Sequence, residues 1–356
     1  MTRVTGKPFR LLFLALVLTL VAAACGGGDE QIGASSSDGG SGGDGASGTI
    51  AVSGSSTVEP ISSLNAEKFQ SENPDVSISV DGPGTGDGFQ LFCEGSTDIS
   101  DASRPIEQEE IDLCEENGIE FVELKVAFDG ITVMTSSANE EVTCVDFLDL
   151  YALLGPESEG FESWSDADQL AGEVKAPNAP YPDAPLEVTG PGEESGTYDS
   201  FAEIVTEGIA VDERDQSEDG PFLRTDYQSS PNDNVIIQGI SGSDSSLGWV
   251  GFAFAEEAGD TIKELEVSNE AQGQDCVAPS AETIADGSYP ISRGLYIYVN
   301  KAKATDNEAV SSYVDYYLGD DGLASVGEVG YVDLPEDQIS ETQGVWESME
   351  TGTREG

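Results

Sequence analysis

The sequence has 356 residues, enough for about two domains with ordinary hydrophobic cores. Its 69 acidic and 14 basic residues give a net charge of −55, which excludes the electrostatics of nucleic-acid binding. Because there is no histidine and no Cys-x-x-Cys pair, we expect neither a metal site nor a cofactor.

The N-terminus is typical of a bacterial secretory signal. Basic residues precede an apolar run, Leu11–Val21, which is too short to span a membrane and ends in small residues before Cys25. We expect residues 1–24 to be a signal peptide and Cys25 to be lipidated, with ordinary signal-peptidase cleavage as the alternative. Residues 25–48, almost entirely Gly, Ser, Asp and Ala after the cysteine, would be a flexible tether. This predicts an extracytoplasmic lipoprotein on the outer face of the cytoplasmic membrane.

Three strand–loop–helix units follow the tether. Thr49–Val52 and Val76–Val80 read as strands, each leading through a glycine-containing loop into a helix. Ser103-Arg104-Pro105 opens a third helix, which Gly118 can end. This rhythm predicts an α/β fold with mostly parallel sheets.

Two apolar segments far apart in the chain, Phe121–Met134 and Leu295–Val299, are suited to be strands that cross between two lobes. One lobe would then contain residues 49–129 and 291–356, and the other residues 130–290. Within the second lobe, residues 153–185 read as a long connection with one short helix. The acidic run at 212–219 reads as a solvated loop rather than a calcium site.

Four cysteines remain after the signal, in a compartment where disulfides persist. Three pairings are possible. We favour Cys93–Cys114, which lies within one expected lobe, and Cys144–Cys276, which brackets the other.

Four loops rich in Ser, Thr and Gly stand directly before expected helices. The first turn of a helix has free N–H groups and partial positive charge, so such loops can surround an oxyanion. Their repetition predicts one shared anion site. The loops are Gly54–Thr57, Gly84–Gly86, Ser103–Pro105 and Ser195–Thr197.

Six motifs, in consistent order from about Thr49 to Asn300, resemble the PstS phosphate-binding proteins of bacterial ABC importers, closest to the SphX-like branch. The resemblance implies a type II periplasmic-binding-protein fold, in which two α/β lobes joined by crossover strands close on phosphate and deliver it to a membrane permease. It implies a monomeric binding protein and no enzyme, with a lipid anchor as the only membrane contact. The motifs are Gly54–Val58, Asp98–Ile106, Val126–Ile131, Gly190–Thr197, Asn232–Gly239 and Leu247–Phe252.

The resemblance also implies the phosphate contacts. Better-studied relatives carry Asp where this chain has Ser103 and Arg where it has Pro191, so part of the site must differ. The matching positions are Thr57 and Val58 with Ser56 adjacent, Thr85, Ser103, and Ser195, Gly196 and Thr197.

Hydrogen phosphate carries a proton that sulfate lacks, so a selective site needs an acceptor as well as donors. We expect Asp129 to be that acceptor, with Asp101 second; the alternative is that Asp129 only caps a turn. Arg104 is the expected cation, since its guanidinium can grip phosphate with two hydrogen bonds, although it could instead form a salt bridge between the lobes. Arg224 is expected to be structural.

Two other functions fit the sequence less well. A protein for another oxyanion, such as sulfate, molybdate or an organophosphate, would need only donors in its site. A secreted phosphate-ester hydrolase could use a clustered hydroxyl such as Ser195, but no histidine is present as its base.

Overall fold

The computed structural model describes residues 46–193, 195–217 and 220–354. The expected signal peptide, Cys25 and nearly all of the tether lie outside these residues. Within the described part of the chain, no helix is both long and apolar enough to cross a membrane.

The main sheet joins strands from the whole chain in the order β2-β1-β3-β12-β4-β8-β6-β7, with β9 also paired to β4. β1 pairs in parallel with β2 and β3, and β6 pairs in parallel with β7 and β8. The strands at both ends of the sheet are therefore parallel, as predicted, but the strand pairs that involve β4 and β12 are antiparallel. The strands are β1 (Gly48–Gly54), β2 (Val76–Asp81), β3 (Ile99–Ala102), β4 (Phe121–Ser136), β6 (Glu187–Gly190), β7 (Gln228–Ser229), β8 (Ser246–Gly251), β9 (Ile262–Glu264) and β12 (Ser292–Asn300).

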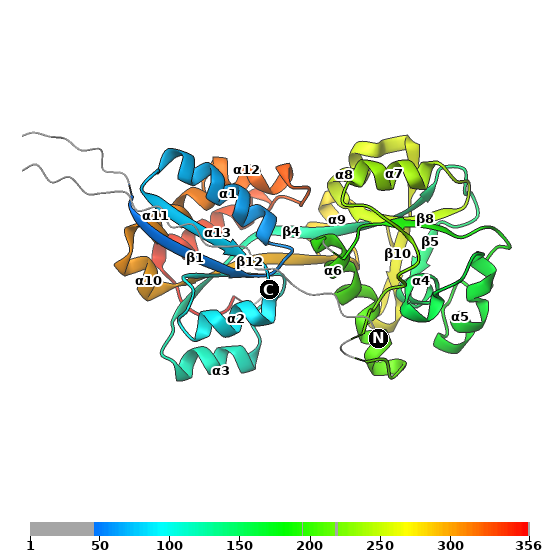
Figure 1. Cartoon of the computed structure of the whole chain (residues 1–356), viewed down its shortest axis with the longest axis horizontal. Helices are drawn as coiled ribbons and strands as arrows, with labels where there is room; N and C mark the ends of the chain where they lie inside the picture. The colour runs from blue at the N-terminus through cyan, green and yellow to red at the C-terminus, as the bar shows by residue number, and fades with distance from the viewer. Residues whose placement is uncertain (1–45, 194, 218–219, 355–356) are drawn as a thin grey trace, which may run out of the picture. The chain divides into compact units, whose positions relative to one another are not determined.

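Strands β4 and β12 lie side by side in the middle of this sheet (Figure 1). The first part of β4, up to Gly130, pairs with β12, and the next part, Ile131–Met134, pairs with β8. One 16-residue strand thus belongs to both ends of the sheet, without a break at Asp129. The two expected crossing segments are indeed strands, and β12 begins three residues earlier than its apolar run.

Two large hydrophobic cores flank these strands, which makes this a two-lobed α/β fold. The first contains Ile50, Phe69 and Tyr313, and the second contains Trp164 and Trp249. The helices of the first lobe are α1 (Glu59–Glu72), α2 (Thr85–Cys93), α3 (Gln108–Glu116), α10 (Lys301–Asp306), α11 (Glu308–Tyr317), α12 (Asp320–Glu328) and α13 (Glu336–Ser348).

The second lobe carries a small sheet, β11-β10-β5, and the remaining helices. Its helix α6 continues into two π-helical segments, η3 and η4, a feature that the sequence does not predict. The elements are β5 (Cys144–Asp146), β10 (Glu266–Asn269), β11 (Gln274–Val277), α4 (Phe147–Leu154), α5 (Asp168–Val174), α6 (Gly196–Phe201), η3 (Ala202–Glu207), η4 (Ile209–Glu213), α7 (Asp233–Ser241), α8 (Phe252–Ala258), α9 (Ala281–Ala285) and the 3₁₀ turns η1 (Pro156–Ser158), η2 (Trp164–Ala167), η5 (Gly259–Thr261) and η6 (Glu270–Gln272).

Three local expectations can be compared with these elements. The 153–185 connection contains the one expected helix, α5, together with η1 and η2. Asp212 and Glu213 belong to the end of η4 rather than to a loop. Val332, near the C-terminus, bonds to the Phe128 backbone and packs in the second core, so the C-terminal segment does not lie wholly against the first.

Both favoured disulfides are present. Cys93–Cys114 joins α2 to α3, and Cys144–Cys276 joins β5 to β11 across the small sheet. Each bridge holds together elements of one lobe, so neither restrains movement between the lobes.

Candidate functional site

The first three predicted loops meet at the carboxyl ends of β1, β2 and β3. The Ser55 N–H donates to the Asp101 carbonyl, and the Gly84 N–H donates to the Gly54 carbonyl, both at 2.9 Å. At Gly54 the backbone has φ +153°, and a Cβ would lie 2.0 Å from the Asp101 oxygen, so only glycine fits. The tertiary fold therefore brings these loops together as one group.

The first loop turns tightly into α1. The Ser55 hydroxyl accepts from the Thr57 N–H at 3.2 Å, and the Val58 N–H donates to the Ser55 carbonyl, also at 3.2 Å. Thr57 is 1 % exposed, and the Val58 side chain is fully buried in the core. Of the first-loop residues, Ser56 and Thr57 have the polar side chains that form hydrogen bonds with residues outside the loop.

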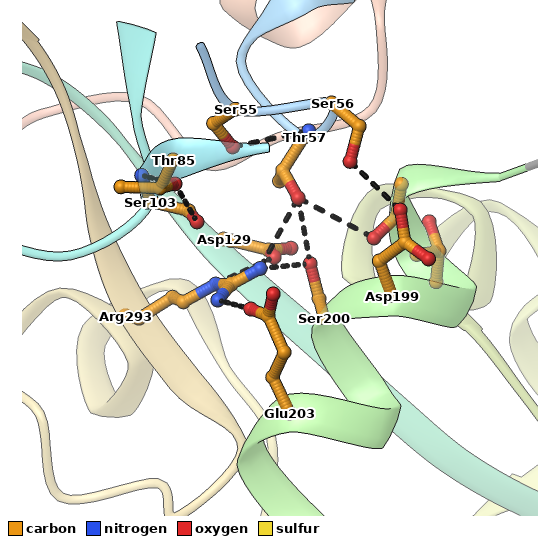
Figure 2. Close-up of polar contacts among 12 residues, drawn as sticks. Ser55, Ser56, Thr57, Thr85, Ser103, Asp129, Asp199, Ser200, Glu203 and Arg293 are labelled. Carbon is orange, nitrogen blue, oxygen red and sulfur yellow. Dashed lines mark hydrogen bonds and ion pairs between the residues drawn. The ribbon is translucent and has the colours of Figure 1, made fainter. Parts of the chain in front are cut away.

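The second and third loops are linked by their hydroxyls. Thr85 Oγ1 and Ser103 Oγ lie 3.0 Å apart, and the Ser103 N–H donates to Thr85 Oγ1 at 3.2 Å. Figure 2 shows this pair close to the first loop. The resemblance-based residues Thr85 and Ser103 thus lie together in loops that are hydrogen-bonded to the first one.

Arg104 is held by its own lobe. Its guanidinium donates to both carboxylate oxygens of Glu110, at 2.7 and 2.9 Å, and stacks over the Phe89 ring at 5.6 Å. The hydrogen bonds to Glu110 are the main reason that the pKa of Arg104 is raised. The two hydrogen bonds that the sequence analysis expected Arg104 to give to phosphate go to Glu110 instead. This salt bridge lies within the first lobe and does not join the lobes.

The fourth loop lies against the first one across the lobes. Ser195 caps α6 by accepting from the Thr197 N–H at 3.2 Å. The Gly196 carbonyl accepts from Thr57 Oγ1 at 3.4 Å, and Ser56 Oγ donates to Asp199 at 2.7 Å. These bonds connect the β1–α1 loop to α6, so the first and fourth predicted loops are in direct contact.

Arg293, which the sequence analysis did not select, lies at the centre of the site (Figure 2). Its Nη2 donates to Thr57 Oγ1 at 3.1 Å and to Ser200 Oγ at 2.5 Å, while these two hydroxyls are 3.0 Å apart. Its Nη1 donates to Glu203 at 2.5 Å. A largely buried arginine, with 14 % of its side chain exposed, therefore contacts groups from both lobes. We call Thr57, Asp129, Ser200, Glu203 and Arg293 the arginine cluster.

One sequence signal could have found Arg293. It stands at the start of the strand that crosses between the lobes, two residues before the apolar run, in a chain with few basic residues. What the sequence does not contain is the register: Arg293 lies directly opposite Asp129 in the antiparallel β4–β12 pair. Opposed residues in such a pair have adjacent side chains.

Asp129 is 1 % exposed and lies on the buried side of Arg293. Its Oδ2 is 3.5 Å from Arg293 Nε, without hydrogen-bond geometry, and neither atom has a hydrogen-bond partner among the described residues. Burial raises the pKa of Asp129, and the Arg293 charge opposes that rise. The expected acceptor is thus a buried carboxylate with a free lone pair.

Asp101, the second acceptor candidate, lies outside the arginine cluster. Its carboxylate accepts from Ser62 Oγ of α1 at 2.9 Å, and Ser62 in turn lies 3.2 Å from the Tyr317 hydroxyl. Burial raises the pKa of Asp101 from 3.8 to about 7. Asp101 therefore supports the packing of α1 and α11 behind the loops.

This raised pKa predicts a pH effect on stability. Since folded Asp101 binds its proton more tightly than the unfolded chain does, its stabilising contribution is complete below about pH 4 and is lost as the pH rises to about 7. The asparagine of an Asp101→Asn variant does not titrate. The free energy of unfolding of this variant, minus that of the native protein, should therefore rise between about pH 4 and 7 and stay constant above pH 7. Urea unfolding at each pH measures this; a difference between variant and native protein that stays constant from about pH 4 to 7 would contradict it.

A pocket of about 690 Å³ opens beside the arginine cluster. Its lining contains the second and third loops and Arg293, whereas Ser195–Thr197 do not line it. Arg293 thus links the pocket to the contact between the first and fourth loops. The lining includes Thr85, Ser103, Arg104, Glu203, Glu207 and Arg293.

Two further sequence candidates are structural. Arg224 is 5 % exposed, pairs with Asp226 at 2.6 Å and donates to the Phe161 carbonyl. Asn232 caps α7 by accepting from the Val235 N–H. No group of three or more metal-ligating side chains that could hold an ion occurs in the described ranges.

Comparisons with known proteins place this site in a family. A model described as a PBP superfamily domain matches residues 39–321. The chain is 38 % identical to Protein SphX of Synechocystis sp. over 305 residues, covering 85 % of this chain and 84 % of that one. It is 33 % identical to the phosphate-binding protein PstS of Staphylococcus aureus strain USA300, covering 90 % and 86 %. The chain belongs to the PstS-like group of the PBP superfamily.

Solved structures agree with this PstS-like assignment. A crystal structure described as a possible phosphate binding protein from Planctomyces limnophilus is 34 % identical, with a TM-score of 0.75, and covers 85 % of this chain and 99 % of that one. PstS from Borrelia burgdorferi, at 22 % identity and a TM-score of 0.55, covers 81 % and 99 % and shares the fold.

Proposed function

We propose that this protein is an extracytoplasmic receptor that binds inorganic phosphate between its lobes and delivers it to the permease of an ABC transporter. The similar proteins whose names state phosphate binding support this proposal. The observation that carries it in this chain is that Arg293, at the junction of the lobes, contacts hydroxyl groups from both of them.

The arginine cluster has the chemistry for a phosphate site. Arg293 supplies a fixed charge with several N–H donors, and Thr57 and Ser200 supply hydroxyls beside it. A hydrogen bond to a charged group contributes about 1.5–3 kcal/mol, so several together give micromolar binding, near −8 kcal/mol. Thr85, Ser103 and the α6 loop with Ser195, Gly196 and Thr197 would complete the donor set as the lobes adjust around the anion.

We further propose that the Arg293–Asp129 pair replaces the arginine and aspartate that relatives carry elsewhere. Neither Ser103 nor Pro191 can supply those charges here. Arg293 would neutralise the anion, and Asp129 Oδ2 would accept the proton of hydrogen phosphate, since this buried oxygen has no hydrogen-bond partner among the described residues. Sulfate, which has no proton to donate, would meet repulsion at the same point.

Lobe closure is the proposed working motion, with residues 49–129 and 291–356 moving against residues 130–290. The bonds Ser56–Asp199 and Thr57–Gly196 lie where the lobes meet and would form as the cleft closes. Such a protein changes no bond in its ligand, so we propose no enzymatic step. Lipidation at Cys25 and a monomeric state are part of the same proposal.

Isothermal titration of the purified protein in moderate salt tests both the ligand and the acceptor. We expect micromolar or tighter phosphate binding and much weaker sulfate binding. Asp129→Asn should abolish most of this preference, because an amide can donate to sulfate where the carboxylate repels it. A folded protein that binds no phosphate would refute the function; a variant with unchanged selectivity would refute only the acceptor.

A further inference from the structure

The Arg293 guanidinium is shared by two carboxylates of different character. Asp129 is buried, comes from the neighbouring strand and is fixed opposite Arg293 by the sheet register. Glu203 comes from η3 in the other lobe, and its side chain is 52 % exposed. In Figure 2, Asp129 lies above the guanidinium of Arg293 and Glu203 lies below it.

The charges of this group do not favour an added anion. Two carboxylates beside one guanidinium leave no excess positive charge for an incoming anion, so a phosphate at Arg293 would meet repulsion from them. The site accepts phosphate readily only if one carboxylate leaves. Asp129 is 1 % exposed and has no solvent to move into, whereas the half-exposed side chain of Glu203 can rotate into solvent.

Glu203 also lies where an incoming anion would arrive. It lines the 690 Å³ pocket together with Arg293, Thr85 and Ser103. An anion entering through this pocket reaches Arg293 from the side that Glu203 occupies. The carboxylate of Glu203 therefore occupies an N–H donor of Arg293 that a phosphate oxygen would need.

We propose that Glu203 is an internal competitor of the ligand: its carboxylate holds Arg293 in the empty protein and is displaced by phosphate. This inference rests on the proposed function. With competition, the observed affinity is the intrinsic affinity multiplied by the fraction of molecules in which Arg293 is free. The ion pair also keeps the arginine ordered in the empty site. Competition also disfavours anions that bind Arg293 too weakly to displace a carboxylate.

The test compares Glu203→Gln with Glu207→Gln by titration with inorganic phosphate. Glu207 lines the same pocket and its substitution makes the same change in net charge, but the described residues give it no ion pair with an arginine. We expect Glu203→Gln to tighten phosphate binding about tenfold, as if Arg293 had been free in one molecule in ten. Glu207→Gln should change it less than about twofold, since only a screened charge is lost.

A second measurement separates competition from general charge. In an Arg293→Lys background, Glu203→Gln should lose most of its effect, because the contact that it relieves is absent. Equal effects of the two glutamine variants, or weaker binding in Glu203→Gln, would overturn the competitor role while leaving phosphate binding in place. If neither the native protein nor any variant binds phosphate, the proposed function itself fails.

Discussion

Replacing Arg293 by lysine is expected to weaken phosphate binding about 100-fold. Lysine keeps the positive charge beside Asp129, so the buried carboxylate stays paired and the fold is preserved. Its ammonium cannot offer phosphate the several N–H donors in one plane that a guanidinium offers, nor span Thr57 and Ser200 at the same time. Loss of two charge-assisted hydrogen bonds, about 3 kcal/mol together, corresponds to that factor. Titration calorimetry measures it directly.

Arg104→Lys is the matched control. Arg104 lines the same pocket, but its guanidinium is bound to Glu110 within the first lobe. We expect less than about a threefold change in phosphate affinity, since an exposed ion pair contributes little. If Arg104→Lys proves the more damaging of the two, the expectation from the sequence is right and the assignment to Arg293 is wrong.

Gly196→Ala should weaken phosphate binding about 30-fold by preventing full closure. A Cβ at this position would lie 2.9 Å from the Thr57 Cα and 3.1 Å from the Ser56 carbonyl oxygen. Since both contacts are with backbone of the other lobe, the added methyl group must hold the lobes apart. The closed state then becomes a minor one, and the observed affinity falls with its population.

Gly208→Ala serves as the comparison, because a Cβ there would meet no atom within 4 Å. Both substitutions favour helix over coil by about 0.5–1 kcal/mol, so neither should lower the melting temperature of the empty protein. Small-angle scattering with saturating phosphate would show a more open form for Gly196→Ala alone. Native affinity in that variant would mean that the lobes need not approach as closely as they do here.

The four anion loops show how far local sequence reasoning reaches. Each was recognisable because Ser, Thr and Gly before a helix is a local pattern, and the structure places the first three at neighbouring strand ends. The two disulfides followed from the expected lobes in the same way. Arg104 shows where local reasoning stops: its neighbours in the sequence match a ligand motif, and the structure pairs its guanidinium with Glu110 in the following helix, so its contact with phosphate stays a prediction.

The α/β class, the crossing strands and the loops that can hold an oxyanion could be predicted from the sequence, since hydrophobic period, glycine positions and helix starts are local properties. The PstS-like family followed from the resemblance of six motifs. Which charges meet is a property of the folded chain. The antiparallel register of β4 and β12 sets Arg293 beside Asp129, 164 positions away in the chain, and the approach of the lobes adds Ser200 and Glu203. Such pairings depend on sheet register and lobe packing, which no local pattern encodes.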